Sequence, residues 1–380
     1  MSATWPPRSP LQESAYEFAK KLPPAPERAA GAAEKQRLLH RAWKDCADFG
    51  LFSMAVPHEF GGDGFTSVEI LDVLEGLGEG CSNDGLLFAI GAHLWAVIQP
   101  LVHFGSAAQR ERYLPRLMSG EWIGAHAMTE SENNSGAAAT RYTESDDGYT
   151  IDGLKLFITN APAAELFVVF ATRDPLLGSR GASAFLVEAT DAGITTGPDE
   201  PKLGLDGSML SSVSLRDVTL PRDRILGSKD GGREVFNCAM AWERLFILAP
   251  LLGAMKRQTQ KVIDYARERR VNGRPIGKLQ MVSGRIADMY VRYVTVRAFV
   301  RENAVLRDAG ELTPARIAAA KLMLAEAGVQ QHLDTLRIHG GYGYMAEAGI
   351  ERELRGAIGG LIYSGTGEVQ RVMIAHELGL

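Results

Sequence analysis

Few cysteines, no excess of one charge sign and no histidine cluster set the first limits on this chain. Its 380 residues include only three cysteines (Cys46, Cys81 and Cys238), too few and too widely spaced for a disulfide framework or a zinc pattern. The formal net charge of −5 gives no general attraction to nucleic acid or to anionic membranes. The eight histidines are scattered, with no pair at the spacing of a helical metal site. We therefore expect neither a metal nor a nucleic-acid partner.

The start of the chain and its hydropathy also lack the marks of exported and membrane proteins. The first residues, Met1-Ser2-Ala3-Thr4-Trp5, contain neither the basic region nor the apolar core of a signal peptide. The apolar runs are predicted to be too short to cross a bilayer. With 46% hydrophobic and 23% charged residues, the composition is that of a globular protein whose length allows two or three cores. We therefore expect a cytoplasmic protein with no membrane partner.

Hydrophobic periodicity predicts an all-α N-terminal domain over residues 1–122. Apolar residues recur at helical spacing with charged residues between them, and Phe60-Gly61-Gly62-Asp63-Gly64 interrupts the pattern as a loop. The predicted helices cover residues 34–49, 67–77, 86–104 and 107–117.

Residues 123–229 are predicted to form a small β domain, because the period of the apolar residues changes to two. Asp152-Gly153 lies between two alternating runs and predicts a hairpin turn. Short strands at this spacing are typical of an antiparallel barrel or sandwich. Further strands are expected at residues 166–172, 184–188 and 211–218.

Residues 230–380 return to the helical pattern. One predicted helix runs from about 234 to 270 and a second from about 280 to 308. Thr313-Pro314 opens a third, because threonine is a good N-cap and proline fits the first helical position. A last helix follows Gly365-Thr366. Long helices with short connections predict a four-helix bundle, so the fold class is mainly α with a small β domain.

Six segments, in order along nearly the whole chain, resemble those of the acyl-CoA dehydrogenase family. That resemblance implies the same three-domain layout, bound FAD, and a dimer or tetramer whose sites are shared between subunits. The matching segments are residues 56–62 (Val-Pro-His-Glu-Phe-Gly-Gly), 113–121 (Tyr-Leu-Pro-Arg-Leu-Met-Ser-Gly-Glu), 157–160 (Phe-Ile-Thr-Asn), 269–280, 340–344 (Gly-Gly-Tyr-Gly-Tyr) and 362–370 (Ile-Tyr-Ser-Gly-Thr-Gly-Glu-Val-Gln).

The catalytic base is predicted at an unusual place for this family. Ser364 stands where the family's tail signature carries the glutamate that removes the substrate α-proton, whereas Glu243 stands where the isovaleryl-CoA type carries its base. Dehydrogenation at Cα and Cβ needs such a base and a hydride acceptor, which no side chain provides. The resemblance implies Glu243 as base, Arg244 as the arginine that orients it, and the Ser364 backbone N–H as a donor to the thioester carbonyl. From the residues alone, Glu243 and Arg244 are also compatible with a solvated helix surface, and Ser364 with a space-filling role.

The flavin contacts follow from the same resemblance, with one departure. The family's Thr-Glu-Pro-Gly-Ala-Gly-Ser-Asp loop reads Thr-Glu-Ser-Glu-Asn-Asn-Ser-Gly at 129–136, so this loop must differ in shape. Arg337 replaces a glutamine of the family and adds charge toward a phosphate. A plain core strand at 157–159 and a solvated basic face around Arg269 remain open. The implied contacts are Met128, Thr129, Ser135, Phe157, Ile158, Thr159, Arg269, Gln280, Arg337, Gly341, Thr366 and Glu368.

These patterns favour an FAD-dependent dehydrogenase of an acyl thioester carried by CoA or by a carrier protein. Trp-Glu-Arg at 242–244 together with Ser-Gly-Thr at 364–366 resembles the subgroup that acts on carrier-bound acyl groups, such as the prolyl carrier-protein dehydrogenases, in biosynthetic pathways. The electron acceptor would be an electron-transfer flavoprotein or oxygen. Three alternatives stay open: an ordinary acyl-CoA dehydrogenase of the isovaleryl type, a flavin-dependent monooxygenase, and a non-catalytic flavoprotein on the same scaffold.

Overall fold

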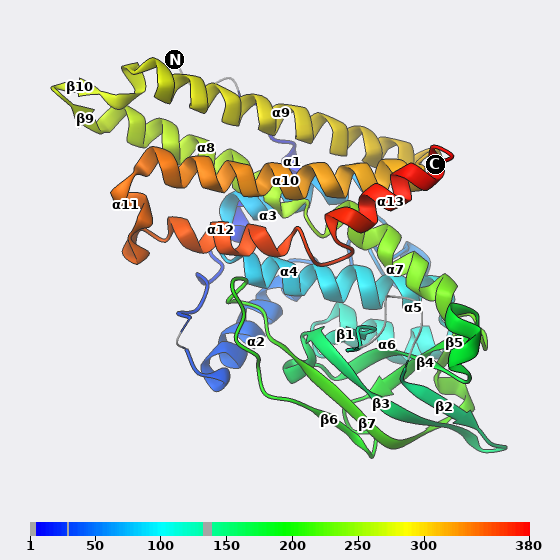
Figure 1. Ribbon diagram of the computed structural model, residues 1–380. Helices are drawn as coiled ribbons and strands as arrows, with labels where there is room; N and C mark the ends of the chain where they lie inside the picture. Colours follow the sequence, from blue (N-terminus) through cyan, green and yellow to red (C-terminus); the bar gives the residue numbers. More distant parts are fainter. Residues whose placement is uncertain (1–4, 29, 132–138) are drawn as a thin grey trace.

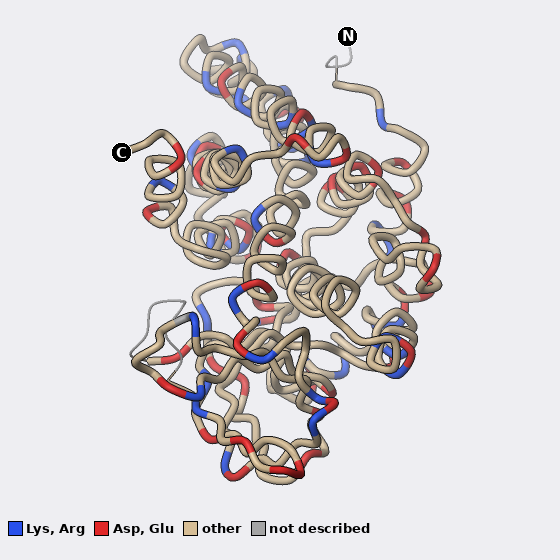
Figure 2. Tube along the Cα trace, turned by 90° about the vertical axis from the view of Figure 1, so that its right-hand side faces the viewer, with Lys and Arg blue, Asp and Glu red and all other residues tan. Residues whose placement is uncertain are grey.

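The computed structural model describes residues 5–28, 30–131 and 139–380 of the chain. Helices from both ends of the sequence pack together, and a sheet lies against one side of them (Figure 1). Acidic and basic residues are interspersed along the described part of the trace, so neither sign of charge gathers on one side of it (Figure 2). Ser135, a predicted flavin contact, lies outside the described residues.

The N-terminal region is helical, as predicted, and two of its helices begin at reciprocal caps. Thr66 Oγ1 accepts the Glu69 backbone N–H at 3.3 Å, while the Glu69 carboxylate accepts the Thr66 backbone N–H at 2.8 Å. Ser106 and Gln109 form the same arrangement. The first helix was not predicted from the sequence, and it packs against the third. The helices are α1 (Pro10–Ala19), α2 (Ala32–Asp48), α3 (Ser67–Gly80), α4 (Asp84–His93), a π-helical segment (Leu94–Ile98), α5 (Gln99–Phe104) and α6 (Ala107–Met118).

Two helical stretches are long and apolar enough to cross a membrane by length and composition alone, contrary to the expectation from the sequence. They are Asp84–Phe104 and Gly232–Glu268. In the first, 94% of the apolar window is buried inside the protein, and in the second 67%. A helix in the centre of a protein core needs the same apolar surface as a membrane span, so burial accounts for both stretches.

The middle region forms one mixed sheet. Its strands are β1 (Gly124–Ala127), β2 (Arg141–Glu144), β3 (Gly148–Thr159), β4 (Leu166–Thr172), β5 (Ala182–Glu188), β6 (Ile194–Thr196), β7 (Leu210–Pro221) and β8 (Ile225–Leu226). The order is β6-β7-β3-β2-β4-β5-β8, and β1 pairs with β4 in parallel. Within the described ranges β6 and β8 do not pair with each other, so the predicted closed antiparallel barrel is not confirmed. Alternation of apolar residues occurs in open and closed sheets alike, which is why the sequence did not separate them.

The hairpin turn predicted at Asp152-Gly153 is wrong. β3 runs through both residues, and its register with β7 shifts at this point. A Cβ at position 153 would lie 2.4 Å from Thr140 Oγ1, so glycine is required there. The Asp152 carboxylate accepts the Asp217 backbone N–H at 2.8 Å. The Asp-Gly pair therefore marks a bulge, and the turn that joins β2 to β3 lies at residues 145–148.

The C-terminal region is helical, as predicted, but its first long helix is broken. Where one helix is predicted over 234–270, α7 ends at Phe246 and α8 begins at Pro250. Proline lacks a backbone N–H and fits the first turn of a helix better than its interior. The second helix spans the predicted 280–308, and Thr313 caps the third. The elements are α7 (Gly232–Phe246), α8 (Pro250–Glu268), β9 (Arg270–Val271), β10 (Arg274–Pro275), α9 (Gln280–Asp308), α10 (Pro314–His339), α11 (Gly341–Tyr344), α12 (Ile350–Gly359) and α13 (Gly367–Glu377).

The helices from the two ends share one hydrophobic core, and the sheet has a second. Trp95 and Trp242 stack with ring centroids 5.5 Å apart and join the N-terminal to the C-terminal helices. Strand β4 belongs to both cores, because Val168 faces the helices and its neighbours Phe167 and Val169 face the sheet interior. Helix α10 contacts α7, α8, α9, α12 and α13, so further helices surround the predicted bundle. The functional cleft lies where the sheet meets these helices.

Candidate active site

A cleft of about 290 Å³ opens between the sheet, helices α4 and α7, and the loop before α13. Eight residues predicted from the sequence line it: Met128, Thr129, Phe157, Ile158, Thr159, Glu243, Arg244 and Ser364. The other lining residues, which the sequence analysis did not single out, are Phe88, Ala92, His126, Phe236, Met240, Tyr363, Gly365 and Val369.

Glu243 is a buried carboxyl group in the last turn of α7. Only 8% of the residue is exposed, and the Ser364 hydroxyl donates a hydrogen bond to Glu243 Oε2 at 2.9 Å. Burial raises the pKa of Glu243 to about 7, while the Ser364 hydrogen bond and the positive charges of Arg244 and Lys321 act in the opposite direction. A carboxyl group with a pKa near neutrality is a suitable general base for a C–H proton.

Ser364 lies in a strained turn that holds it against Glu243. Its φ of +56° is in the left-handed region, and Gly365 follows at +92°. Within the described chain, the Ser364 backbone N–H has no acceptor. Arg244 Nε donates to the Ser364 carbonyl at 3.5 Å, so Arg244 contacts the turn directly and influences the Glu243 carboxylate through its charge. The turn thus presents a hydroxyl to the carboxylate and leaves an N–H available for a ligand.

Lys321 on α10 stabilises the same turn by hydrogen bonds to its backbone. Its Nζ donates to the carbonyls of Gly360 at 2.9 Å and Gly365 at 2.7 Å, although the residue is 1% exposed. Gln370 Nε2 adds a bond to the Gly365 carbonyl at 3.0 Å. Buried carbonyl groups need such partners, so these side chains determine the path of the loop that carries Ser364.

Phe157 is displayed toward the cleft by an irregularity in β3. The register with β7 shifts between Lys155 and Ile158, and Phe157 has a φ of +56° with 60% of the residue exposed. Ile158 is buried in the sheet core. A large exposed aromatic residue in a strained conformation is costly for an isolated domain, and a planar ring stacked on Phe157 would compensate for it.

His126 adds an unpaired acceptor beside the cleft. Its Nδ1 donates to the Ala96 carbonyl at 3.1 Å, and Nε2 has no partner in the described part of the chain. Burial lowers the pKa of His126 to about 4, so the ring is neutral. The exposed Phe157 ring, the unpaired His126 nitrogen and the free Ser364 N–H fit a planar group with polar edges, such as the ring system of a flavin.

Of the predicted loop at 129–136, the structure describes only residues 129–131. One ion pair contacts the chain both before and after this loop. Lys155 Nζ donates to Glu130 Oε1 at 2.6 Å. The Glu130 carboxylate also accepts the backbone N–H groups of Ala139 and Thr140. Residues before and after the loop are therefore held together at the rim of the cleft.

Four predicted flavin contacts lie at the opposite end of the helical region. Arg269, Gln280, Arg337 and Gly341 are at the ends of α8, α9, α10 and α11 near the β9–β10 hairpin, far from α13 (Figure 1). None of them lines the cleft of the same chain. Thr366 and Glu368 stand at the start of α13, where Thr366 Oγ1 caps the helix.

The residues that the sequence analysis missed lie on elements whose partners are distant in sequence. Tyr363 directly precedes Ser364 and was therefore within reach of the tail motif. His126 and Lys321 gave no signal, because a histidine in a strand and a lysine in a helix are usually surface residues. Only the tertiary structure reveals that Lys321 is buried and that His126 lines the cleft.

Comparisons with known proteins match the three regions of the chain to the three domains of one family. The N-terminal domain of the acyl-CoA dehydrogenases matches residues 8–121, the middle domain residues 125–218 and the C-terminal domain residues 230–379. The L-prolyl-[peptidyl-carrier protein] dehydrogenase of Pseudomonas fluorescens is 37% identical over 355 residues, which cover 93% of each chain. The corresponding protein of a Serratia strain is 34% identical over 98% of this chain and 97% of its own.

Solved structures superpose on nearly the whole chain. The prolyl acyl carrier protein oxidase AnaB superposes with a TM-score of 0.90 at 34% identity, covering 97% of this chain and 98% of its own. PigA with FAD and proline superposes with a TM-score of 0.90 at 32% identity, covering 97% of each chain.

Proposed function

The chain belongs to the acyl-CoA dehydrogenase family and is an oxidoreductase, and from this we propose that it dehydrogenates an acyl thioester with FAD, using Glu243 as the base. The observation that carries the proposal is the position of Glu243. This buried carboxyl group, with a pKa of about 7, shares one cleft with Phe157, Thr159 and Ser364. The structure of PigA with FAD supports the cofactor, and relatives named for their action on carrier-bound prolyl groups support the substrate class.

In this proposal the residues of the chain bind, orient and deprotonate the substrate. Glu243 takes the proton from Cα, and the Ser364 hydroxyl stabilises the Glu243 carboxylate before the transfer. The Ser364 backbone N–H donates to the thioester carbonyl as it gains enolate character. Phe157 and Thr159 would hold the flavin ring. FAD, when bound, would supply the acceptor for the hydride that leaves Cβ, so that the C–H bonds broken at Cα and Cβ are replaced by one double bond between these carbons.

A carrier-bound prolyl group is the first substrate to test. The two prolyl carrier-protein dehydrogenases and AnaB act on prolyl groups attached to carrier proteins according to their names. The altered sequence at 129–136 replaces glycines of the family's loop, which supports a different fit to the carrier end of the thioester. Electrons would pass to oxygen or to an electron-transfer flavoprotein, and detection of hydrogen peroxide in turnover distinguishes the two.

We also propose that the functional protein is a dimer or a tetramer in the cytoplasm. Arg269, Gln280, Arg337 and Gly341 lie far from the cleft of their own chain, and a second copy would bring them to it (Figure 1). Exposed apolar side chains on α9 and α13, including Met281, Val291 and Val372, support burial in such an interface.

Anaerobic spectroscopy tests the proposed reaction. Purified protein should be yellow with non-covalent FAD, and the flavin should bleach when L-prolyl carrier protein is added without oxygen. A monooxygenase would require oxygen and a reductant for any change, and a non-catalytic flavoprotein would stay oxidised with every thioester. Protein that cannot be reconstituted with FAD would contradict the proposal altogether.

A further inference from the structure

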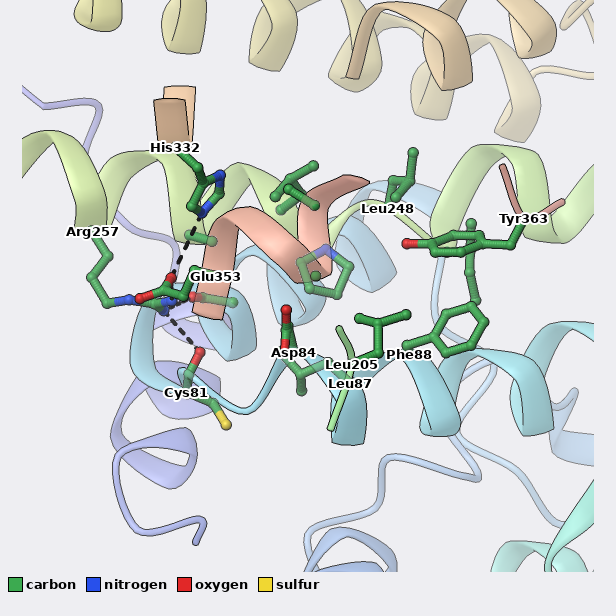
Figure 3. Close-up of a pocket in the computed structure, with 17 residues that line it drawn as sticks. Cys81, Asp84, Leu87, Phe88, Leu205, Leu248, Arg257, His332, Glu353 and Tyr363 are labelled. Carbon is green, nitrogen blue, oxygen red and sulfur yellow. Dashed lines mark hydrogen bonds and ion pairs between the residues drawn. The ribbon is translucent and has the colours of Figure 1, made fainter. Parts of the chain in front are cut away.

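A second cavity lies directly behind the cleft and shares a wall with it. Phe88 and Tyr363 line both spaces, and their rings are in contact with centroids 4.3 Å apart. The second cavity has a volume of about 60 Å³. Figure 3 shows it between α4, α8 and α12, with apolar side chains such as Leu87 and Leu248 around it.

Three charged or titratable side chains at one end of this cavity pair with one another. Arg257 Nη2 contacts Glu353 Oε2 at 2.6 Å, and His332 Nε2 lies 3.7 Å from the same oxygen (Figure 3). Arg257 also donates to the Cys81 carbonyl at 2.8 Å. Burial opposes ionisation of Glu353, but Arg257 and His332 outweigh it and hold the pKa of this carboxyl well below its ordinary value. This cluster has its charge balanced by protein groups.

The negative charge of Asp84, by contrast, is not balanced by an ion pair with a described residue. It occupies the first position of α4, where Oδ1 accepts the Gly85 backbone N–H at 2.9 Å, and no cation lies within ion-pair distance in the described part of the chain. Oδ2 lies close against Gly356, where an added Cβ would be 1.5 Å away. Burial, followed by the negative charge of Glu353, raises the pKa of Asp84 to about 7. A partly buried carboxyl group that lines a cavity and has no cationic partner among the described residues is unfavourable unless a ligand supplies one.

Tyr363 connects Asp84 to the cleft. Figure 3 shows its hydroxyl directed into the cavity, and the described residues offer this hydroxyl no hydrogen-bond partner. Burial raises the pKa of Tyr363, and the negative charges of Asp84 and Glu243 add to the effect, so the phenol lies within the field of both carboxyl groups. The next residue, Ser364, donates to Glu243. Tyr363 therefore lies in the wall between the cleft and the cavity, near the carboxyl groups on both sides of it.

Resting on the proposed function, we propose that this cavity recognises the basic nitrogen of an aminoacyl thioester, and that Asp84 sets the preference for such substrates. The cavity has room for several ordered waters, which would link an N–H group near Phe88 and Tyr363 to the Asp84 carboxylate. A cation beside the mouth of the cavity stabilises the ionised form of Asp84 in surroundings of low dielectric constant. A metal ion is not the favoured occupant, since the described residues contain no group of three His, Cys, Asp or Glu side chains placed to hold one.

The matched substrates for the test are L-prolyl and cyclopentanecarbonyl thioesters on the same carrier protein, which differ only by NH in place of CH₂. The wild type should favour the prolyl thioester in kcat/KM for anaerobic flavin reduction by about 10- to 100-fold, the usual range for a hydrogen bond to a charged group. Asp84→Asn keeps an oxygen for the Gly85 N–H and should reduce this preference to about threefold or less, mainly through a higher KM for the prolyl thioester. Asp45→Asn makes the same chemical change on the exposed face of α2 and should leave the preference intact.

Binding measurements separate this inference from the proposed function. In a Glu243→Gln background, calorimetric titration with the two thioesters should show the same preference in Kd, and Asp84→Asn should remove it there too. If neither thioester reduces the wild-type flavin, the proposed reaction fails, and the calorimetry alone decides the role of Asp84. An unchanged preference in Asp84→Asn, by kinetics or by binding, overturns the inference. If Asp84→Asn does not fold, Tyr363→Phe takes its place and should lower the preference severalfold, whereas no change in that variant overturns the inference equally.

Discussion

At the scale of single residues, the proposed mechanism depends on Glu243 taking the role of the glutamate that the family carries in its tail. Ser364 occupies the tail position and donates its hydroxyl to Glu243 Oε2, so the two positions still meet in one site. Burial raises the pKa of Glu243 to about 7, which moves a weak base into the useful range. In the proposed mechanism Glu243 therefore performs the proton transfer that the tail glutamate performs elsewhere in the family.

The pH dependence of flavin reduction follows from this pKa. Glu243 must be ionised to accept a proton, so kcat/KM should fall about tenfold per pH unit below pH 7 and level off above it. Stopped-flow measurements between pH 5 and 9 would show this decrease, the acid limb of the pH profile. A profile that is flat through this range would exclude Glu243 as the titrating base.

Removal of the Ser364 hydroxyl should shift that limb in a definite direction. The Ser364 hydrogen bond favours the ionised form and so lowers the pKa of Glu243. Ser364→Ala should therefore move the acid limb to higher pH while leaving the plateau rate within about tenfold of the wild type, a smaller loss than removal of a general base. The same variant should keep its FAD. A limb that moves to lower pH would contradict the assigned direction of this hydrogen bond.

At the scale of elements, the loop before α13 depends on a lysine from a different helix. Lys321→Met removes a donor from the Gly360 and Gly365 carbonyls; the Gly365 carbonyl keeps its bond from Gln370, and the Gly360 carbonyl is left unpaired. The free energy of unfolding should fall by about 1 to 3 kcal/mol, the usual cost of one unpaired buried group. Loss of the Lys321 charge should also raise the pKa of Glu243 further. Denaturant unfolding and the pH profile check the two effects, and Lys278→Met on the surface serves as control.

The elements also show what the sequence was able to predict. Local signals were sufficient for α9 at residues 280–308, for the Thr313 cap and for the helical ends of the chain, because periodicity and capping are local properties. They failed at Asp152-Gly153, where the pair forms a bulge against Thr140, and at residues 247–249, where Pro250 starts a new helix. Barrel closure depends on which distant strands pair, and alternation along one strand carries no such information.

The residues of the candidate site likewise divide into those that local motifs predicted and those that they did not. Glu243, Ser364 and the strand at 157–159 were found because they lie in contiguous motifs. Lys321 was missed because its importance comes from burial and from partners on another element. His126 and Asp84 were missed because only the tertiary structure shows which cavities they line. Sequence spacing does not report burial of a single charged residue.

At the scale of the whole molecule, the predicted flavin contacts fall into two groups at opposite ends of the helical region. If a second copy supplies the distant group, Arg269→Glu should weaken FAD retention although Arg269 does not line the cleft of its own chain. Light scattering should show a dimer or larger assembly for the wild type, and the variant should release more FAD on gel filtration at the same assembly state. Arg270→Glu, on the adjacent exposed position of β9, is the matched control. A monomeric wild type that retains FAD would contradict the shared site.

The most direct test of the central claim is the rate of anaerobic flavin reduction in Glu243→Gln, measured beside Ser364→Ala with L-prolyl carrier protein. The substitution to glutamine is nearly isosteric, so folding and FAD content should remain while the proton acceptor is lost. We predict a loss of about 10² to 10⁴ in rate for Glu243→Gln, the usual range for a general base, and a far smaller loss for Ser364→Ala. Wild-type reduction by Glu243→Gln would place the base elsewhere, and a crippled Ser364→Ala beside an active Glu243→Gln would reverse the roles assigned to the two residues.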